Sequence, residues 1–68
     1  MLNVKELKAE IVRNGYTQKE VAKMIGVSEK TFISRLKRGV FGTDEAKILI
    51  EKLNIVDVGR VFFADSVT

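Results

Sequence analysis

The sequence contains no cysteine and no histidine. Without cysteine the chain can form neither a disulfide nor a thiolate metal site, so its fold must depend on packing alone. Without histidine it lacks the commonest general base and the commonest zinc ligand. Its 68 residues also leave little space for a substrate cleft. We therefore expect no enzymatic activity, no cofactor, no metal and no small-molecule substrate.

Proline, internal repeats, low-complexity stretches and long apolar runs are also missing. No apolar run approaches the roughly 18 residues that span a bilayer, and no signal-peptide pattern opens the chain. A hydrophobic fraction of 46% with a charged fraction of 31% is typical of a soluble globule rather than a disordered tail. These features predict one cytoplasmic domain over residues 1–68, with no membrane partner.

Helix start signals and apolar stripes recur along the chain. Asn3 with Glu6, and Thr17 with Glu20, have the spacing of capping boxes, and Thr43 is placed to cap a later helix. Together they predict an all-α fold, a compact four- to five-helix bundle. A last apolar segment, residues 58–63, is short enough to be either helical or extended. The residues expected to face inward are Val4, Leu7, Ile11, Val12, Val21, Ala22, Ile25, Phe32, Leu36, Ala46, Leu49, Ile50 and Leu53.

The most informative stretch is residues 18–38, which the sequence divides into two short helices, 18–25 and 29–38. Between them, Gly26 can adopt the left-handed backbone that ends a helix, and Ser28 can cap the next one. Two helices joined at a steep angle by a short turn with glycine are typical of a helix-turn-helix, whose second helix enters the major groove of DNA.

The basic residues concentrate in the same stretch. Residues 13–38 contain seven Lys and Arg against Glu20 and Glu29, a net charge of +5. Residues 39–68 contain three basic and five acidic residues, a net charge of −2. This asymmetry is the electrostatic pattern expected of a phosphate-binding face, although a solvated lysine-rich surface is the simpler alternative.

The run YTQKEVAKMIGVSEKTF resembles the helix-turn-helix of the Cro and phage-repressor superfamily, also called the XRE family. The resemblance covers roughly residues 3–55 and depends most on Thr17-Gln18, Ala22 and Gly26-Val27-Ser28. The run SEKTF and the tail VFFA, which ends at Ala64, are similar to small proteins of temperate phages of Gram-positive bacteria. The resemblance implies a regulator of a phage lysis–lysogeny switch that works in the cytoplasm of a bacterial host.

Through this resemblance, operator DNA becomes the expected partner, with the second helix in the major groove. Lys30 can donate to guanine, Glu29 can accept from cytosine, and Ile33 can pack on a thymine methyl. The base-reading positions are Ser28, Glu29, Lys30, Ile33 and Ser34. The phosphate-contacting positions are Gln18, Lys19, Lys23, Arg35, Lys37 and Arg38.

Two residues suit a protein partner better than DNA. Glu29 sets a negative charge against the phosphates, and Ile33 is an apolar group on a face that usually carries polar side chains. With Phe32 and Val40-Phe41, Ile33 is expected to form an apolar patch. Similar small phage proteins include modulators that bind the phage repressor itself, so the resemblance implies an alternative function: an antirepressor that binds a cognate phage repressor through Glu29, Ile33 and Arg35.

A homodimer is a further expected partner, because a single module of this size buries little surface on DNA. The apolar C-terminal end, residues 58–63, together with an outward-facing Ile48, is the predicted dimer surface.

Overall fold

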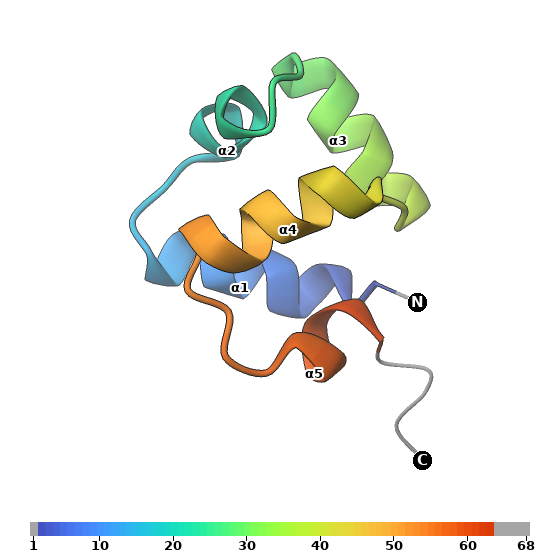
Figure 1. Ribbon diagram of the computed structural model, residues 1–68. Helices are drawn as coiled ribbons and strands as arrows, with labels where there is room; N and C mark the ends of the chain where they lie inside the picture. Colours follow the sequence, from blue (N-terminus) through green and yellow to red (C-terminus); the bar gives the residue numbers. More distant parts are fainter. Residues whose placement is uncertain (1, 64–68) are drawn as a thin grey trace.

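The computed structural model describes residues 2–63, which form five helices and no strand (Figure 1). The predicted all-α bundle is therefore confirmed, and the ambiguous last segment is helical as far as Phe62. Ala64 and the rest of residues 64–68 lie outside the described residues. The helices are α1 (Val4–Arg13), α2 (Gln18–Met24), α3 (Glu29–Arg38), α4 (Thr43–Lys52) and α5 (Val58–Phe62).

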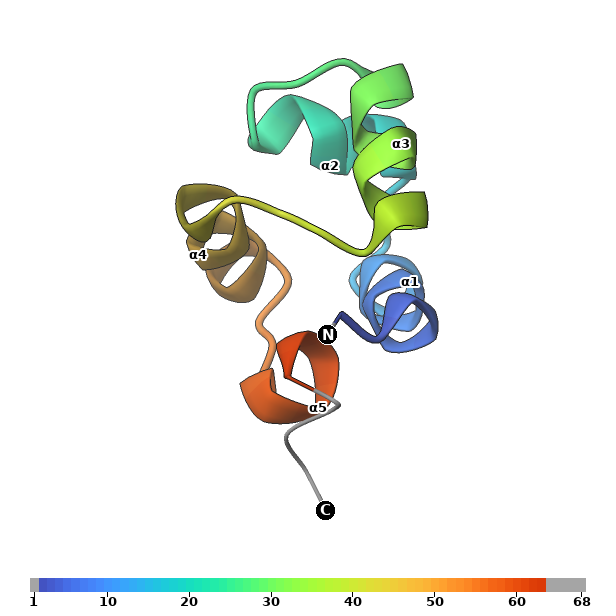
Figure 2. The same ribbon diagram turned by 90° about the vertical axis from the view of Figure 1, so that its right-hand side faces the viewer.

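The helices form an upper pair, a middle helix and a lower pair. In Figure 1, α2 and α3 form the upper part, α4 crosses the middle, and α1 lies below it with α5. Helix α2 packs on α3, and α1 packs on α5. Turning the molecule by 90° shows α4 and α1 on opposite sides beneath the α2–α3 pair (Figure 2).

One apolar core joins these parts. Phe32 of α3, Leu7 of α1 and Leu49 of α4 are all at most 1% exposed, so three helices contribute fully buried side chains. The stripe predicted for α1 is wrong at Val12, which is 74% exposed, because the core lies on the side of the helix that carries Leu7 and Ile11. The buried residues are Leu2, Leu7, Ile11, Val21, Ala22, Ile25, Phe32, Leu36, Leu49, Leu53, Ile55 and Val61.

The helix starts follow the sequence in part. Thr17 and Glu20 form the predicted capping box, with reciprocal bonds of 2.9 and 3.1 Å. Asn3 caps α1 by accepting from the Glu6 amide, but no reciprocal bond from Glu6 completes a box. The Asn3 amide donates instead to the Val61 carbonyl at 2.7 Å. A tertiary contact with α5 therefore replaces the local one.

The start of α4 corrects a second cap. Thr43 is the first helical residue rather than the cap, and Gly42 occupies the cap position. Glu45 accepts from the Gly42 amide at 2.9 Å, so the carboxylate satisfies the free N–H group.

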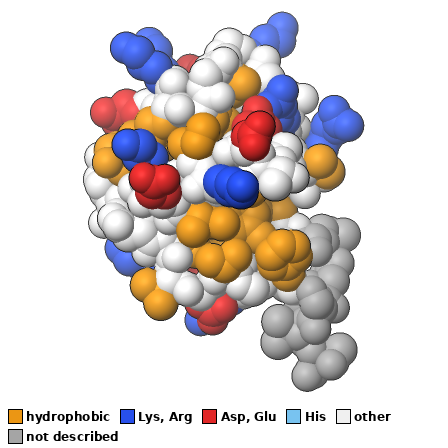
Figure 3. Space-filling view, in the orientation of Figure 1, with side chains coloured by type: hydrophobic (Ala, Val, Ile, Leu, Met, Phe, Trp, Pro, Cys, Tyr) orange, Lys and Arg blue, Asp and Glu red, His pale blue; other side chains and the backbone are white. Residues whose placement is uncertain are grey.

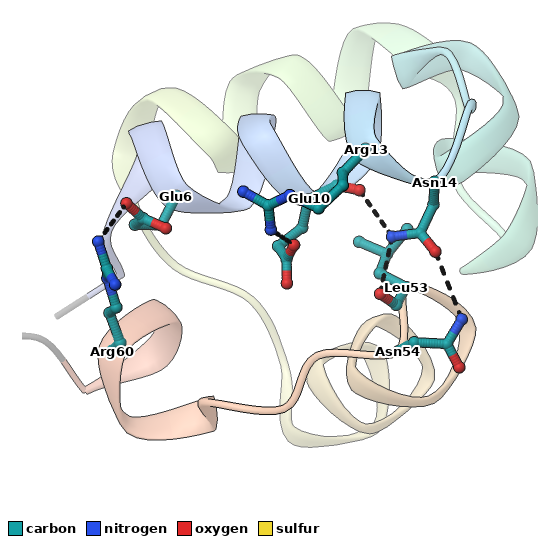
Figure 4. A network of polar contacts seen from close by, with 7 residues as sticks. All are labelled: Glu6, Glu10, Arg13, Asn14, Leu53, Asn54 and Arg60. Carbon is teal, nitrogen blue, oxygen red and sulfur yellow. Dashed lines mark hydrogen bonds and ion pairs between the residues drawn. The ribbon is translucent and has the colours of Figure 1, made fainter.

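The ends of α1 and α4 are joined by side-chain amides (Figure 4). Asn14 donates through Nδ2 to the carbonyls of Glu10 and Leu53, both at 2.8 Å, and accepts from Asn54 at 3.3 Å. Asn54 has the left-handed φ of 51° that ends α4. Asn14 thus contacts Leu53 and Asn54, which are 39 and 40 positions away in the sequence, and these bonds hold α1 and α4 together.

Candidate nucleic-acid interface

The connection between α2 and α3 is short and internally bonded. The Gly26 amide donates to the Lys23 carbonyl at 3.1 Å, and the Val27 amide donates to the Ala22 carbonyl at 3.0 Å. These two bonds form a Schellman motif, which requires the left-handed φ of 78° found at Gly26. The chain then turns into α3 at a steep angle to α2 (Figures 1 and 2).

Burial decides which side of α3 faces outward. Phe32 and Leu36, one turn apart, are inside the core. Lys30, Ser34 and Lys37 are exposed and lie at the i, i+4 and i+7 positions of one helix face. Two of the predicted base-reading residues, Lys30 and Ser34, therefore share an exposed face with the predicted phosphate contact Lys37.

Ser28 is less available than the sequence suggests. Its hydroxyl accepts from the Thr31 amide at 3.1 Å and donates to the Thr31 hydroxyl at 2.9 Å. Both the proton and an acceptor site of Ser28 are therefore engaged in starting α3. Its neighbour Glu29 is exposed in the first turn of the same helix.

Helix α2 contributes a second set of polar groups. Lys19 and Lys23 are exposed and one turn apart, whereas Gln18 is half-buried in the first turn. Space-filling shows Lys and Arg side chains projecting around the upper half of the molecule, over α2 and α3 (Figure 3). The exposed cations of α2 and α3 thus lie on the same part of the protein.

Two basic residues of this stretch are engaged in ion pairs. Arg13 at the end of α1 pairs with Glu10, and Arg35 of α3 pairs with Glu45 of α4. Arg38 is exposed at the end of α3. The cations that remain exposed on α2 and α3 are Lys19, Lys23, Lys30, Lys37 and Arg38.

The predicted apolar patch on α3 is wrong in part. Phe32 is completely buried and packs against Phe41 with a ring-centroid distance of 5.6 Å, so it cannot belong to a surface. Ile33 is half-buried rather than fully exposed, and Val40 is 59% exposed. The reason is that the loop after α3 folds back onto the inner side of that helix.

The predicted dimer surface also changes. Ile48 is half-buried and packs on the core instead of facing outward, and Val61 is buried. The apolar surface at this end is a groove of about 350 Å³ between the α3–α4 loop and α5, below the centre of Figure 3. Its apolar lining consists of Leu2, Val40, Phe41, Ala46, Ile50, Phe62 and Phe63.

Neither a metal cluster nor a membrane-spanning segment is found within residues 2–63. No group of three or more His, Cys, Asp or Glu side chains in this range is placed to hold a metal ion. Each helix in the same range is too short or too polar to cross a bilayer.

No known protein family, curated protein or solved structure matches this chain. Membership of the Cro and phage-repressor superfamily therefore stays a prediction from the sequence.

Sequence reasoning missed Glu45, whose partner Arg35 lies across a loop. Helix-spaced ion pairs can be read from a sequence because they are three or four positions apart. Arg35 and Glu45 are ten positions apart on different helices, so only the fold of the chain brings them together.

Proposed function

We propose that this protein is a sequence-specific DNA-binding regulator of the Cro-like type, serving a phage lysis–lysogeny switch. The observation that carries the proposal is the exposed face of α3, where Lys30, Ser34 and Lys37 lie in a row. Helix α3 inserts this face into the major groove, with Lys30 and Ser34 at base edges.

Phosphate contacts follow from the positions of the remaining cations. Lys19 and Lys23 of α2 lie toward one strand of the duplex, and Lys37 and Arg38 lie toward the phosphates beside the end of α3. Each lysine or arginine that meets a phosphate releases counterions, so affinity depends steeply on salt.

The test is fluorescence anisotropy with the intergenic DNA beside the gene and with a scrambled duplex, at two salt concentrations. Lys30→Ala should cost about 1–3 kcal/mol on the intergenic DNA and much less on the scrambled duplex. Lys37→Ala should weaken both duplexes alike and lower the salt slope by about 1. Lys8→Ala, an exposed lysine of α1, is the charge-matched control and should leave both affinities nearly unchanged. Equal losses on the two duplexes for Lys30→Ala would refute its base-reading role.

Glu29 and Ile33 favour a second candidate, an antirepressor that binds a phage repressor through the same face. Glu29 is exposed at the front of α3, and Ile33 beside it is half-buried. In this case a glutamate would pair with basic residues of the repressor, and the isoleucine would anchor the contact. Glu29→Lys or Ile33→Ala should then abolish repressor capture, while the intergenic and scrambled duplexes should bind equally. Undiminished capture by both variants would exclude this interface.

A further inference from the structure

The ion pair between α3 and α4 joins Arg35 to Glu45. Glu45 uses both carboxylate oxygens: Oε1 accepts from the Gly42 amide at 2.9 Å, and Oε2 contacts Nη1 of Arg35. The bond to Gly42 holds the carboxylate in place at the start of α4. Arg35 therefore meets an acceptor whose position is already determined by the helix start.

The arginine of this pair is more sheltered than the arginines of the other ion pairs among the described residues. The Arg35 and Glu45 side chains are 35% and 17% exposed, whereas Arg13 and Arg60 in the other two pairs are 63% and 65% exposed. Partial shielding from water strengthens the attraction between opposite charges. Arg35 is thus the arginine of the three that is most shielded from water.

The pair also borders the surface where DNA phosphates are expected. Arg35, Arg38, Asp44 and Glu45 line one open hollow of about 490 Å³ at the end of α3. A phosphate that approaches Arg35 meets the negative charges of Glu45 and Asp44 at the same time. It also finds Nη1 of the guanidinium engaged by Glu45, so fewer of the guanidinium donors are free for the phosphate.

We propose that Glu45 is a specificity-determining residue that removes Arg35 from the phosphate contacts. By neutralising Arg35, Glu45 lowers the affinity of the protein for DNA of any sequence. The base contacts of Lys30 and Ser34 then contribute a larger fraction of the total binding free energy. This inference rests on the proposed DNA-binding function, and it differs from the sequence-based assignment of Arg35 to a phosphate.

The test is the salt dependence of binding to a random-sequence duplex between 50 and 200 mM salt. Glu45→Gln should steepen the slope by about 0.9, equivalent to about 3.5-fold more loss of affinity over this range, because Arg35 gains a phosphate. Glutamine keeps an oxygen for the Gly42 amide, so α4 remains capped. Arg35→Gln alone should leave the slope unchanged, and the double variant Glu45→Gln, Arg35→Gln should return it to the wild-type value.

Glu51→Gln is the matched control, because it removes the same charge from an exposed position near the other end of α4. Its slope should equal that of the wild type. A slope reduced by about 0.9 in Arg35→Gln would overturn the inference, as would equal slopes for Glu45→Gln and Glu51→Gln. The expected slopes with equal affinity for intergenic and scrambled DNA would uphold the neutralisation of Arg35 by Glu45, but would refute both sequence-specific regulation and the role of Glu45 in specificity. Failure to bind any duplex at 50 mM salt would refute both.

Discussion

The amide contact between α1 and α4 predicts a large effect for one substitution, Asn14→Ala. The variant loses two bonds of 2.8 Å from Nδ2, to the Glu10 and Leu53 carbonyls, and the weaker bond from Asn54. With about 0.5–1.5 kcal/mol for each of the two short bonds, the free energy of unfolding should fall by about 1–3 kcal/mol. For a domain of this size each kcal/mol corresponds to roughly 4–8 °C in Tm.

The measurement is urea unfolding followed by circular dichroism, with thermal melts in parallel. Asn14→Asp keeps the acceptor but faces the Leu53 carbonyl with an oxygen, so it should be at least as destabilising as alanine. Asn54→Gly is the matched control, because it loses only the exposed 3.3 Å bond and keeps the left-handed backbone. The control should change the free energy of unfolding by less than about 0.5 kcal/mol. If Asn14→Ala also falls below about 0.5 kcal/mol, this contact does not hold the helices together.

The remaining predictions concern the backbone and the core. Gly26→Ala should destabilise the protein by about 1–2 kcal/mol, because φ is 78° there although no atom lies within 4 Å of the added Cβ. Gly59→Ala should instead stabilise it by about 0.5–1 kcal/mol, because α5 is helical at this residue and the added Cβ meets only Asp57 at 3.8 Å; a loss of stability in urea would contradict this. Phe32→Ala should cost about 3–5 kcal/mol and remove much of the helical circular dichroism signal, while Val56→Ala, at a 95% exposed position, should leave that signal intact.

The local signals of this sequence were sufficient to predict where α2 and α3 begin and end. The two helices predicted at residues 18–25 and 29–38 correspond to α2 and α3, because Thr17 and Ser28 cap the starts and Gly26 ends the first. Caps and apolar spacing act within four residues, so they can be read without knowing the fold. The exposed lysines of these helices were predicted for the same reason.

Two of the errors concern residues whose surroundings come from elsewhere in the chain. Val12 belongs to the apolar stripe predicted for α1, but the core lies on the side of the helix that carries Leu7 and Ile11, so Val12 is 74% exposed. Phe32 was expected both to face inward and to border a surface patch; only the first expectation holds, because the α3–α4 loop sets Phe41 against it. In both cases the local pattern is compatible with a buried or an exposed side chain, and tertiary packing decides between the two.

The sequence by itself determined the all-α class, the helix boundaries to within a residue or two, and the concentration of positive charge on residues 13–38, since each depends on neighbours along the chain. Only the tertiary structure decided how that charge is distributed. It pairs Arg35 with Glu45 and leaves Lys30 and Lys37 exposed, because an ion pair between two helices requires their packing to bring the charges together.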